Sequence, residues 1–154
     1  MSRAFYYKWS EKQTINDADQ VIGRLTLPSG NYIIIGEASV AANKLSETID
    51  CNQPLECKLK AGTVEDKIML NVWSDDVFHS GNWGMITLNI EVKLTGGIAE
   101  LICTHGNPGC ISVFDVSLTA VQVEEQISED DRSIQSKSYP HAKIQKRTVM
   151  RFSH

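Results

Sequence analysis

One stretch of strict alternation constrains the fold of this chain more than any other feature. From Met85 to Leu94, apolar and polar side chains take turns, and the apolar positions after Met85 are Ile86, Leu88, Ile90, Val92 and Leu94. A period of two places alternate side chains on the same face of a strand. The run therefore predicts one long antiparallel strand with one face buried and the other in water.

Shorter alternating segments extend this pattern along the chain. Further strands are expected over residues 5–9, 21–27, 32–40, 55–61, 68–72, 98–103 and 114–120. Clusters of Gly, Pro and Asn between them are interpreted as turns, namely Pro28-Ser29-Gly30-Asn31, Gly96-Gly97 and Asn107-Pro108-Gly109. This spacing predicts an all-β protein, an antiparallel β-sandwich of jelly-roll character, with a closed barrel as the other architecture that fits.

Two details refine the expected sandwich. Gly36 and Ala38 share the apolar face of one strand, and such small residues predict the close approach of a second sheet. Near the end of the last strand, the apolar residues change from the face that carries Ala120 to the opposite face, which carries Val121 and Val123. That slip indicates a bulge, or a strand whose surroundings change.

Length and composition place these strands in one folded domain. The chain has 154 residues, of which 42% are hydrophobic and 22% charged, and it can bury a sizeable core unaided. We divide it into an N-terminal strand and lead-in (1–20), a β-sandwich domain (21–124) and a polar C-terminal extension (125–154). The extension is expected to be flexible or to dock as an arm.

The formal net charge of −4 is unevenly distributed. An acidic cluster is followed by a basic tail, and the preferred interpretation is two solvated segments. The alternatives are that these segments interact with each other, with a neighbouring subunit or with a polyanion. The acidic balance argues against nucleic-acid binding as the function. The residues concerned are Glu124, Glu125, Glu129, Asp130 and Asp131, then Lys137, Lys143, Lys146, Arg147 and Arg151.

The sequence carries no sign of membrane insertion or secretion. Its first residues lack the apolar core and cleavage site of a secretory signal, and no stretch approaches the ~20 apolar residues of a membrane helix. We therefore expect a soluble protein, cytoplasmic as synthesised, unless it belongs to a virion, is released without a signal or represents the processed form of a longer precursor.

Four cysteines, Cys51, Cys57, Cys103 and Cys110, have spacings unlike those of zinc sites. Cys57 and Cys103 fall within alternating strands and are interpreted as small core residues. A disulfide between strands or loops is geometrically open, but free thiols are the preferred expectation for a chain expected to be intracellular.

Three segments, in order, resemble the tumour necrosis factor and complement globular-head superfamily. They are Leu27-Pro28-Ser29-Gly30-Asn31-Tyr32-Ile33-Ile34, then residues 91–101 around Gly96-Gly97, then Val113-Phe114-Asp115-Val116-Ser117-Leu118-Thr119-Ala120. The second departs from the family pattern because Ile98 stands where a hairpin acid is usual. The resemblance implies a jelly roll that forms homotrimers and recognises proteins or sugars without catalysis. It also implies that relatives of this shape occur at the tips of viral and phage fibres and in trimeric bacterial lectins.

The usual catalytic and metal motifs are missing from the sequence. The four histidines, His79, His105, His141 and His154, form neither a His-x-His pair nor His-Glu-x-x-His. No nucleophile elbow or phosphate loop is present. Cys103 and His105 lie two apart, a weak indication of a thiol dyad. No cofactor and no metal are expected.

The segment 73–84 is the strongest candidate for a binding loop. It joins two expected strands, and binding residues favour loops on rigid β scaffolds. Indoles stack on sugar rings, while carboxylates and amides bond to ring hydroxyls; two carboxylates are too few for a calcium site. Packing within the chain or against another subunit is the alternative. The candidate ligand-binding residues are Trp73, Asp75, Asp76, His79, Asn82 and Trp83.

These observations lead to three hypotheses. The first is a non-enzymatic binding or assembly module, homotrimeric, that recognises a glycan or a protein through its loops. The second is a phage-like structural component of a fibre, tail or capsid decoration. The third and least favoured is a hydrolase or thiol enzyme that uses Cys103 with His105, or Asp75 with Asp76.

Overall fold

The computed structural model describes residues 3–43, 54–71 and 83–124. Within these ranges the chain is all-β, as expected, and every strand pairing is antiparallel. The elements are β1 (Ala4–Trp9), β2 (Gln13–Thr14), β3 (Gln20–Ala42), β4 (Leu55–Ala61), β5 (Val64–Leu70), β6 (Trp83–Thr104) and β7 (Ile111–Val123).

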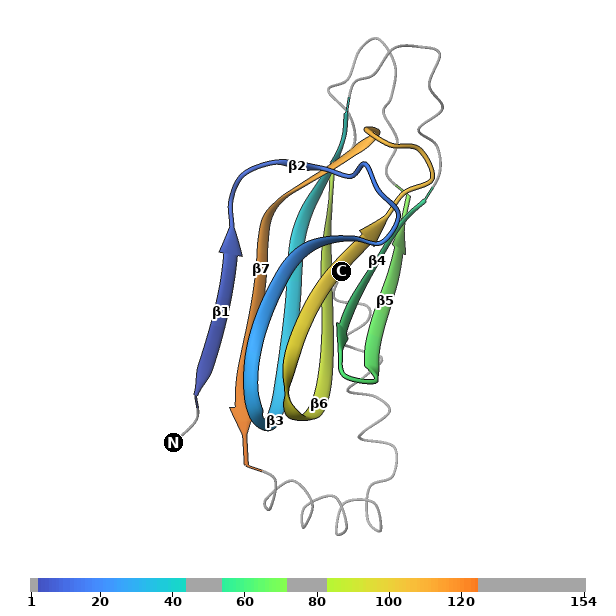
Figure 1. Ribbon diagram of the computed structural model, residues 1–154. Helices are drawn as coiled ribbons and strands as arrows, with labels where there is room; N and C mark the ends of the chain where they lie inside the picture. Colours follow the sequence, from blue (N-terminus) through green and yellow to red (C-terminus); the bar gives the residue numbers. More distant parts are fainter. Residues whose placement is uncertain (1–2, 44–53, 72–82, 125–154) are drawn as a thin grey trace, which may run out of the picture.

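Hydrogen bonds connect the strands in the order β1-β7-β3-β6-β4-β5, with β2 beside β7. The centre of this order is a ribbon of two very long strands, because β3 and β6 pair from Gln20 with Cys103 to Ala41 with Trp83. Figure 1 shows both strands bending back on themselves, so that the two halves of the ribbon face each other. A long antiparallel ribbon folded in two in this way is the topology of a jelly roll.

The fold gives two layers. The first, here called the β1–β7 layer, contains β1, β7, residues 30–42 of β3 and residues 83–94 of β6. The second, the β4–β5 layer, contains β4, β5, residues 20–27 of β3 and residues 98–104 of β6.

The bends occur at the turns predicted at residues 28–31 and 96–97, but these turns do not separate the strands as expected. Leu27 pairs with Gly97 and Ser29 with Thr95, so the segments containing Pro28 and Gly96 lie opposite each other within continuous strands. Gly96 has φ of +102°, a backbone conformation that suits glycine. The turn residues bend the ribbon instead of ending it, because each strand keeps the other as its hydrogen-bonding partner on both sides of the corner.

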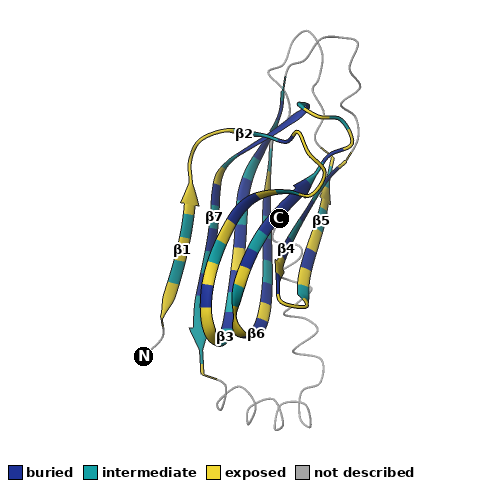
Figure 2. Cartoon of the chain, in the orientation of Figure 1, coloured by how far each residue is buried: buried dark blue, intermediate teal, exposed yellow. Residues whose placement is uncertain are grey.

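The core lies between the layers, and buried and exposed residues alternate along the strands as expected. The apolar residues of the opening run, from Ile86 to Leu94, are all buried, and Figure 2 shows buried and exposed residues alternating along β3. A Cβ on Gly36 would lie 3.2 Å from Leu118 Cδ2 and 3.4 Å from the Cδ1 atoms of Leu101 and Leu59. Residues of both layers thus crowd this position, which confirms the predicted close approach.

The bulge of β7 lies earlier than expected. The register with β3 shifts between Glu37 and Ser39, which pair with Ser117 and Phe114. Asp115, with φ of +49°, is part of the extra length of β7 at this point. Beyond the bulge, every second residue of β7 points into the core without interruption, from Val116 to Ala120. Val121 and Val123 therefore do not mark a change of face within the strand. They lie on the outer face of the layer.

The preference for free thiols was wrong. Cys57 of β4 and Cys103 of β6 form a disulfide, with a Cα–Cα distance of 4.2 Å. The two residues are direct partners in the ladder and are buried. Directly opposed residues of an antiparallel pair come this close where no hydrogen bonds join them. Cys110 is disulfide-bonded as well.

Candidate functional site

Most of the loop predicted to bind a ligand lies outside the described residues. This applies to Trp73, Asp75, Asp76, His79 and Asn82. Trp83 is the first residue of β6, where its backbone pairs with Ala41 of β3. The structure therefore shows the two strands that carry the loop but does not test the predicted ligand contacts.

The described residues do define the base of that loop. β5 ends at Leu70 and β6 begins at Trp83. A Cβ on Gly84 would lie 2.7 Å from Leu70 Cδ2, so the leucine side chain packs directly on the glycine backbone. Leu70 and Gly84, which flank the candidate loop in the sequence, therefore lie side by side.

A polar network ties together the strand ends near the start of β6. Ser112 is fully buried, and its hydroxyl donates to Asn43 Oδ1 at 2.9 Å. The Asn43 side-chain amide donates to the carbonyl of Gly109 at 2.8 Å, and Thr14 Oγ1 lies 3.3 Å from Ser112 Oγ. These bonds satisfy buried polar atoms and hold β2, β3 and β7 in register, which is a structural role.

The cysteine–histidine pair of the third hypothesis is engaged elsewhere. Cys103 is bonded to Cys57 and has no thiol. His105 is buried, and its Nδ1 accepts a hydrogen bond from the backbone N–H of Asn107 at 3.1 Å. The arrangement therefore offers no thiolate nucleophile.

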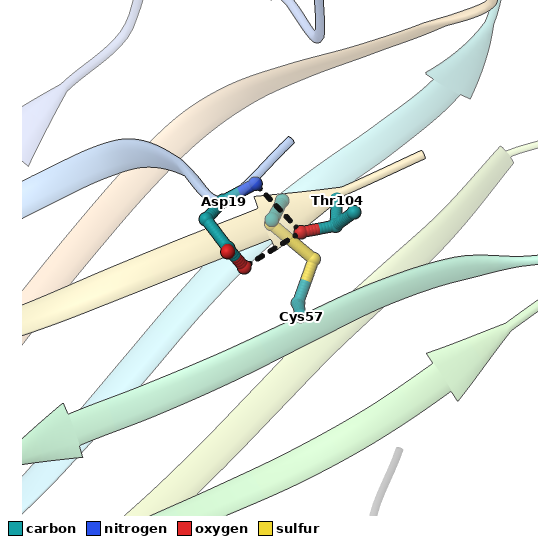
Figure 3. The surroundings of a disulfide bond; sticks show 4 residues. Asp19, Cys57 and Thr104 are labelled. Atoms are coloured by element: carbon teal, nitrogen blue, oxygen red, sulfur yellow. Dashed lines mark hydrogen bonds between the residues drawn. A yellow bond between two sulfur atoms is a disulfide. The ribbon is translucent and has the colours of Figure 1, made fainter. Parts of the chain in front are cut away.

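Beside this disulfide, Thr104 joins β6 to the segment before β3, as Figure 3 shows. Thr104 Oγ1 accepts from the backbone N–H of Asp19 at 2.9 Å and donates to Asp19 Oδ1 at 3.1 Å. Lys58 Nζ lies 3.8 Å from the same carboxylate oxygen. Asp19 has φ of +52°, and these contacts hold its backbone in that conformation.

The outer face of the β4–β5 layer is charged. Arg24 of β3 bonds to Glu100 of β6 at 2.8 Å. On the neighbouring strands, Lys67 lies 3.8 Å from Glu56, and Lys60 is exposed. Exposed pairs of this kind add little stability. The same face also exposes the apolar side chains of Val21, Met69 and Ile98.

The outer face of the β1–β7 layer, here called the β1–β7 face, has a different character. Its exposed apolar residues include Tyr6 of β1, which is 64% exposed, and Ile35 of β3, which is 37% exposed. Thr119 of β7 lies between them in the ladder. The neighbouring row contains Ala4, Val121 and Ile33. The sequence analysis did not identify this face, although the unbroken apolar run 32–35 was a signal for it.

Two classes of site receive no support from the described parts of the chain. Among those residues, no three of His, Cys, Asp and Glu are grouped so that they could hold a metal ion. No helix in the same ranges is long and apolar enough to cross a membrane.

Comparisons with known proteins agree on the fold. A scan against protein-family models matches nothing, and a sequence comparison with curated proteins also finds no match. Solved structures do match: a chain of the T13 particle of infectious bursal disease virus aligns over 79% of this chain and 31% of its own length, with 8% identity and a TM-score of 0.51. The present chain thus spans about a third of that viral chain.

Two smaller proteins match over nearly their full length. The Eiger tumour necrosis factor of S. frugiperda aligns over 80% of this chain and 93% of its own, with 9% identity and a TM-score of 0.46. The vertex protein P5 of PRD1 aligns over 80% and 96%, with 14% identity and a TM-score of 0.42. At these identities the likenesses concern the fold alone, and the jelly-roll expectation is confirmed at that level.

Proposed function

We propose that this chain is a non-enzymatic binding or assembly module that works as a homo-oligomer. The observation that carries the proposal is the uncharged centre of the β1–β7 face. Tyr6 and Ile35 are exposed there, with no charged residue in their row. An exposed apolar area with a polar surround is typical of a surface that another protein covers.

Catalysis is not part of the proposal. The best sequence candidate for a nucleophile, Cys103, is bonded to Cys57. The buried hydroxyl of Ser112 is bonded to the half-buried side chain of Asn43 as part of the strand-end network. The structure that matches with a TM-score of 0.51 is a component of a viral particle, so the same fold serves assembly there.

Recognition of a glycan or protein would be the task of the segment 73–83, whose strands β5 and β6 meet at its base. Trp83→Ala should abolish binding on a glycan array while the solution mass stays the same. Trp9→Ala is the matched control, because this indole is half-exposed on β1, at the opposite end of the strand order from β5. An array without hits for the intact protein would contradict glycan recognition.

A structural component of a virus or phage particle is the second candidate. The likeness to a chain of a viral particle, with a TM-score of 0.51, favours it. Buried disulfides favour it too, because they persist in oxidising surroundings such as virion surfaces and not in reduced cytoplasm. Light scattering separates the two candidates: a fixed small oligomer, with the homotrimer expected from the sequence, supports the module, and particle-sized assemblies support the component.

A further inference from the structure

The strand order gathers apolar side chains on the β1–β7 face that no single segment of sequence contains. Tyr6, Thr119, Ile35 and Asn89 form one row across β1, β7, β3 and β6, and Ala4, Val121, Ile33 and Glu91 form the next. Val123 lies beside Asn31 in a third row. The centre of the face is thus free of charge over two rows and three strands.

Residues 32–35 of β3 are apolar on both faces. Tyr32 and Ile34 point into the core, and Ile33 and Ile35 point outward. A strand that meets water on one side normally alternates between apolar and polar residues, whereas continuous apolar runs occur in strands covered on both faces. The outer side of this strand therefore has the composition of a covered surface.

The charged residues of the face lie outside its uncharged centre and include both signs. Lys8 is at one end of a row on β1, and Glu37 of β3 lies in the same row. Glu91 is at the far end of another row on β6, and Lys93 lies two residues beyond it on that strand. Relative to the row through Tyr6 and Ile35, Lys8 lies two residues to one side and Glu91 two residues to the other. Neither takes part in an ion pair with the described part of the chain. Lys8 and Glu91 thus occupy diagonally opposite corners of the area that these rows cover on β1, β7, β3 and β6.

The other two corners are uncharged: Ala4 on β1 and Thr87 on β6. The four corners outline an almost square patch, because four strands at ~4.8 Å spacing span about 14 Å and four residues along a strand also span about 14 Å. Consider a two-fold axis that lies in the plane of the face and runs along the diagonal between the uncharged corners. Rotation about this axis maps the square onto itself and exchanges the two charged corners. The sheets of two copies then cross at close to a right angle, one of the two common geometries of sheet packing.

We propose that the β1–β7 face binds the same face of a second copy of this chain about this two-fold axis, with Lys8 of each copy opposite Glu91 of the other. This contact rests on the self-association in the proposed function, and it is two-fold instead of the expected three-fold. A second copy suits the face better than a partner of one charge sign, since the face presents lysine and glutamate at exchangeable positions. Its uncharged centre is buried in the same step.

The expected affinity follows from the size of the face. Because the two sheets cross at close to a right angle, the copies overlap only over the width of four strands in each direction, about 19 by 19 Å. This area is below the ~800 Å² that each partner buries in a standard stable interface. The dimer should therefore dissociate on dilution, in the roughly micromolar range.

Sedimentation of the full chain over a range of concentrations tests the contact. The mass should rise from the 17.2 kDa of one chain to twice that value. Ile35→Lys should weaken the dimer at least about 100-fold, because it places a charge at the centre of the buried area. Met69→Lys is the matched control: Met69 is 62% exposed on the outer face of β5, and its replacement should leave the mass unchanged.

A charge exchange tests the geometry. Lys8→Glu and Glu91→Lys should each weaken the dimer roughly tenfold, since each places like charges opposite one another twice per dimer. The double variant should return to within about threefold of the native affinity. Lys60→Glu on β4 makes the same change on the charged face and should have no effect.

Each other outcome overturns a distinct statement. A trimer would refute the two-fold contact but keep the oligomeric module. A monomer at all concentrations would refute the contact and the homo-oligomer, while loop-borne ligand binding would remain open to the array experiment. Additive losses in the double charge variant would show that Lys8 and Glu91 do not meet. A monomer that dimerises only after removal of residues 125–154 would show that the chain's own extension occupies the face.

Discussion

At the scale of single residues, Tyr32 shows how the bend of β3 is held from inside the sandwich. Its ring is buried and meets that of Phe5 edge to face, with 6.0 Å between the centroids. Its hydroxyl donates to the carbonyl of Pro28 at 2.8 Å. One side chain thus fills the core and bonds to the backbone at the corner, four residues earlier in the chain.

The burial of this hydroxyl makes stability sensitive to alkaline pH. Burial raises the pKa of Tyr32, and the positive charge of Arg3 opposes part of that rise. In the unfolded chain the phenol has its ordinary pKa of about 10. Its contribution to stability is therefore complete below about pH 10 and declines as the pH rises toward the folded pKa, because only the unfolded chain releases the proton easily.

Tyr32→Phe should accordingly lower the free energy of unfolding by about 1–2 kcal/mol at pH 7, since the Pro28 carbonyl loses its donor. It should also flatten the decline above pH 10. Urea unfolding of both proteins between pH 7 and 11 measures the two effects. Tyr6→Phe, at an exposed position, is the control, and an equally steep decline in the Tyr32 variant would contradict the assignment.

At the scale of strands, the buried disulfide fastens β4 to the long ribbon. Cys57 and Cys103 are 46 residues apart in sequence and directly opposed in the ladder. Closing a loop of this size in the unfolded chain typically contributes 2–5 kcal/mol. Cys57→Ala/Cys103→Ala should reduce the free energy of unfolding by about that amount, measured in guanidinium chloride without reductant.

The single variant Cys103→Ala provides the control for this prediction. It should lose about as much as the double variant, because Cys57 alone cannot form the bond. A loss below about 1 kcal/mol in both would show that the cross-link does not constrain the unfolded chain. Oxidised protein should also yield the two cysteines in one linked pair of peptides.

Sequence alone predicted the strands better than their connections. Alternation identified the buried face of residues 86–94 and of residues 55–61 because burial acts on each strand locally. It could not distinguish a hairpin at Gly96-Gly97 from a corner, because both need glycine. The difference depends on whether β3 keeps pairing beyond the bend, which is a long-range property. The same limit applies to Cys57 and Cys103, whose register follows from that pairing.

At the scale of the whole molecule, the candidate surfaces depend on strand order. Tyr6, Val121 and Ile33 come from three distant parts of the sequence, and only the order β1-β7-β3 places them together. The loop 73–83 was recognisable because its residues are contiguous. The β1–β7 face was not, although the run 32–35 indicated a strand covered on both sides.

The contact between layers also depends on a single position. Gly36 of β3 faces Leu118 of its own layer and Leu59 and Leu101 of the other. A valine at this position adds three carbons where even a Cβ would be within 3.2–3.4 Å of three leucine methyls. The layers cannot separate without loosening the core on either side, because interiors are close-packed.

Gly36→Val should therefore destabilise the protein by about 1–3 kcal/mol, and Gly36→Ala by less. Chemical unfolding measures both. The control is the double variant Gly36→Val/Leu118→Ala, in which the shortened side chain on β7 leaves room for part of the valine. Its loss should be smaller than the sum of the two single losses by about 0.5–2 kcal/mol, because residues in contact are coupled. Strict additivity would show that Gly36 does not set the spacing between the layers.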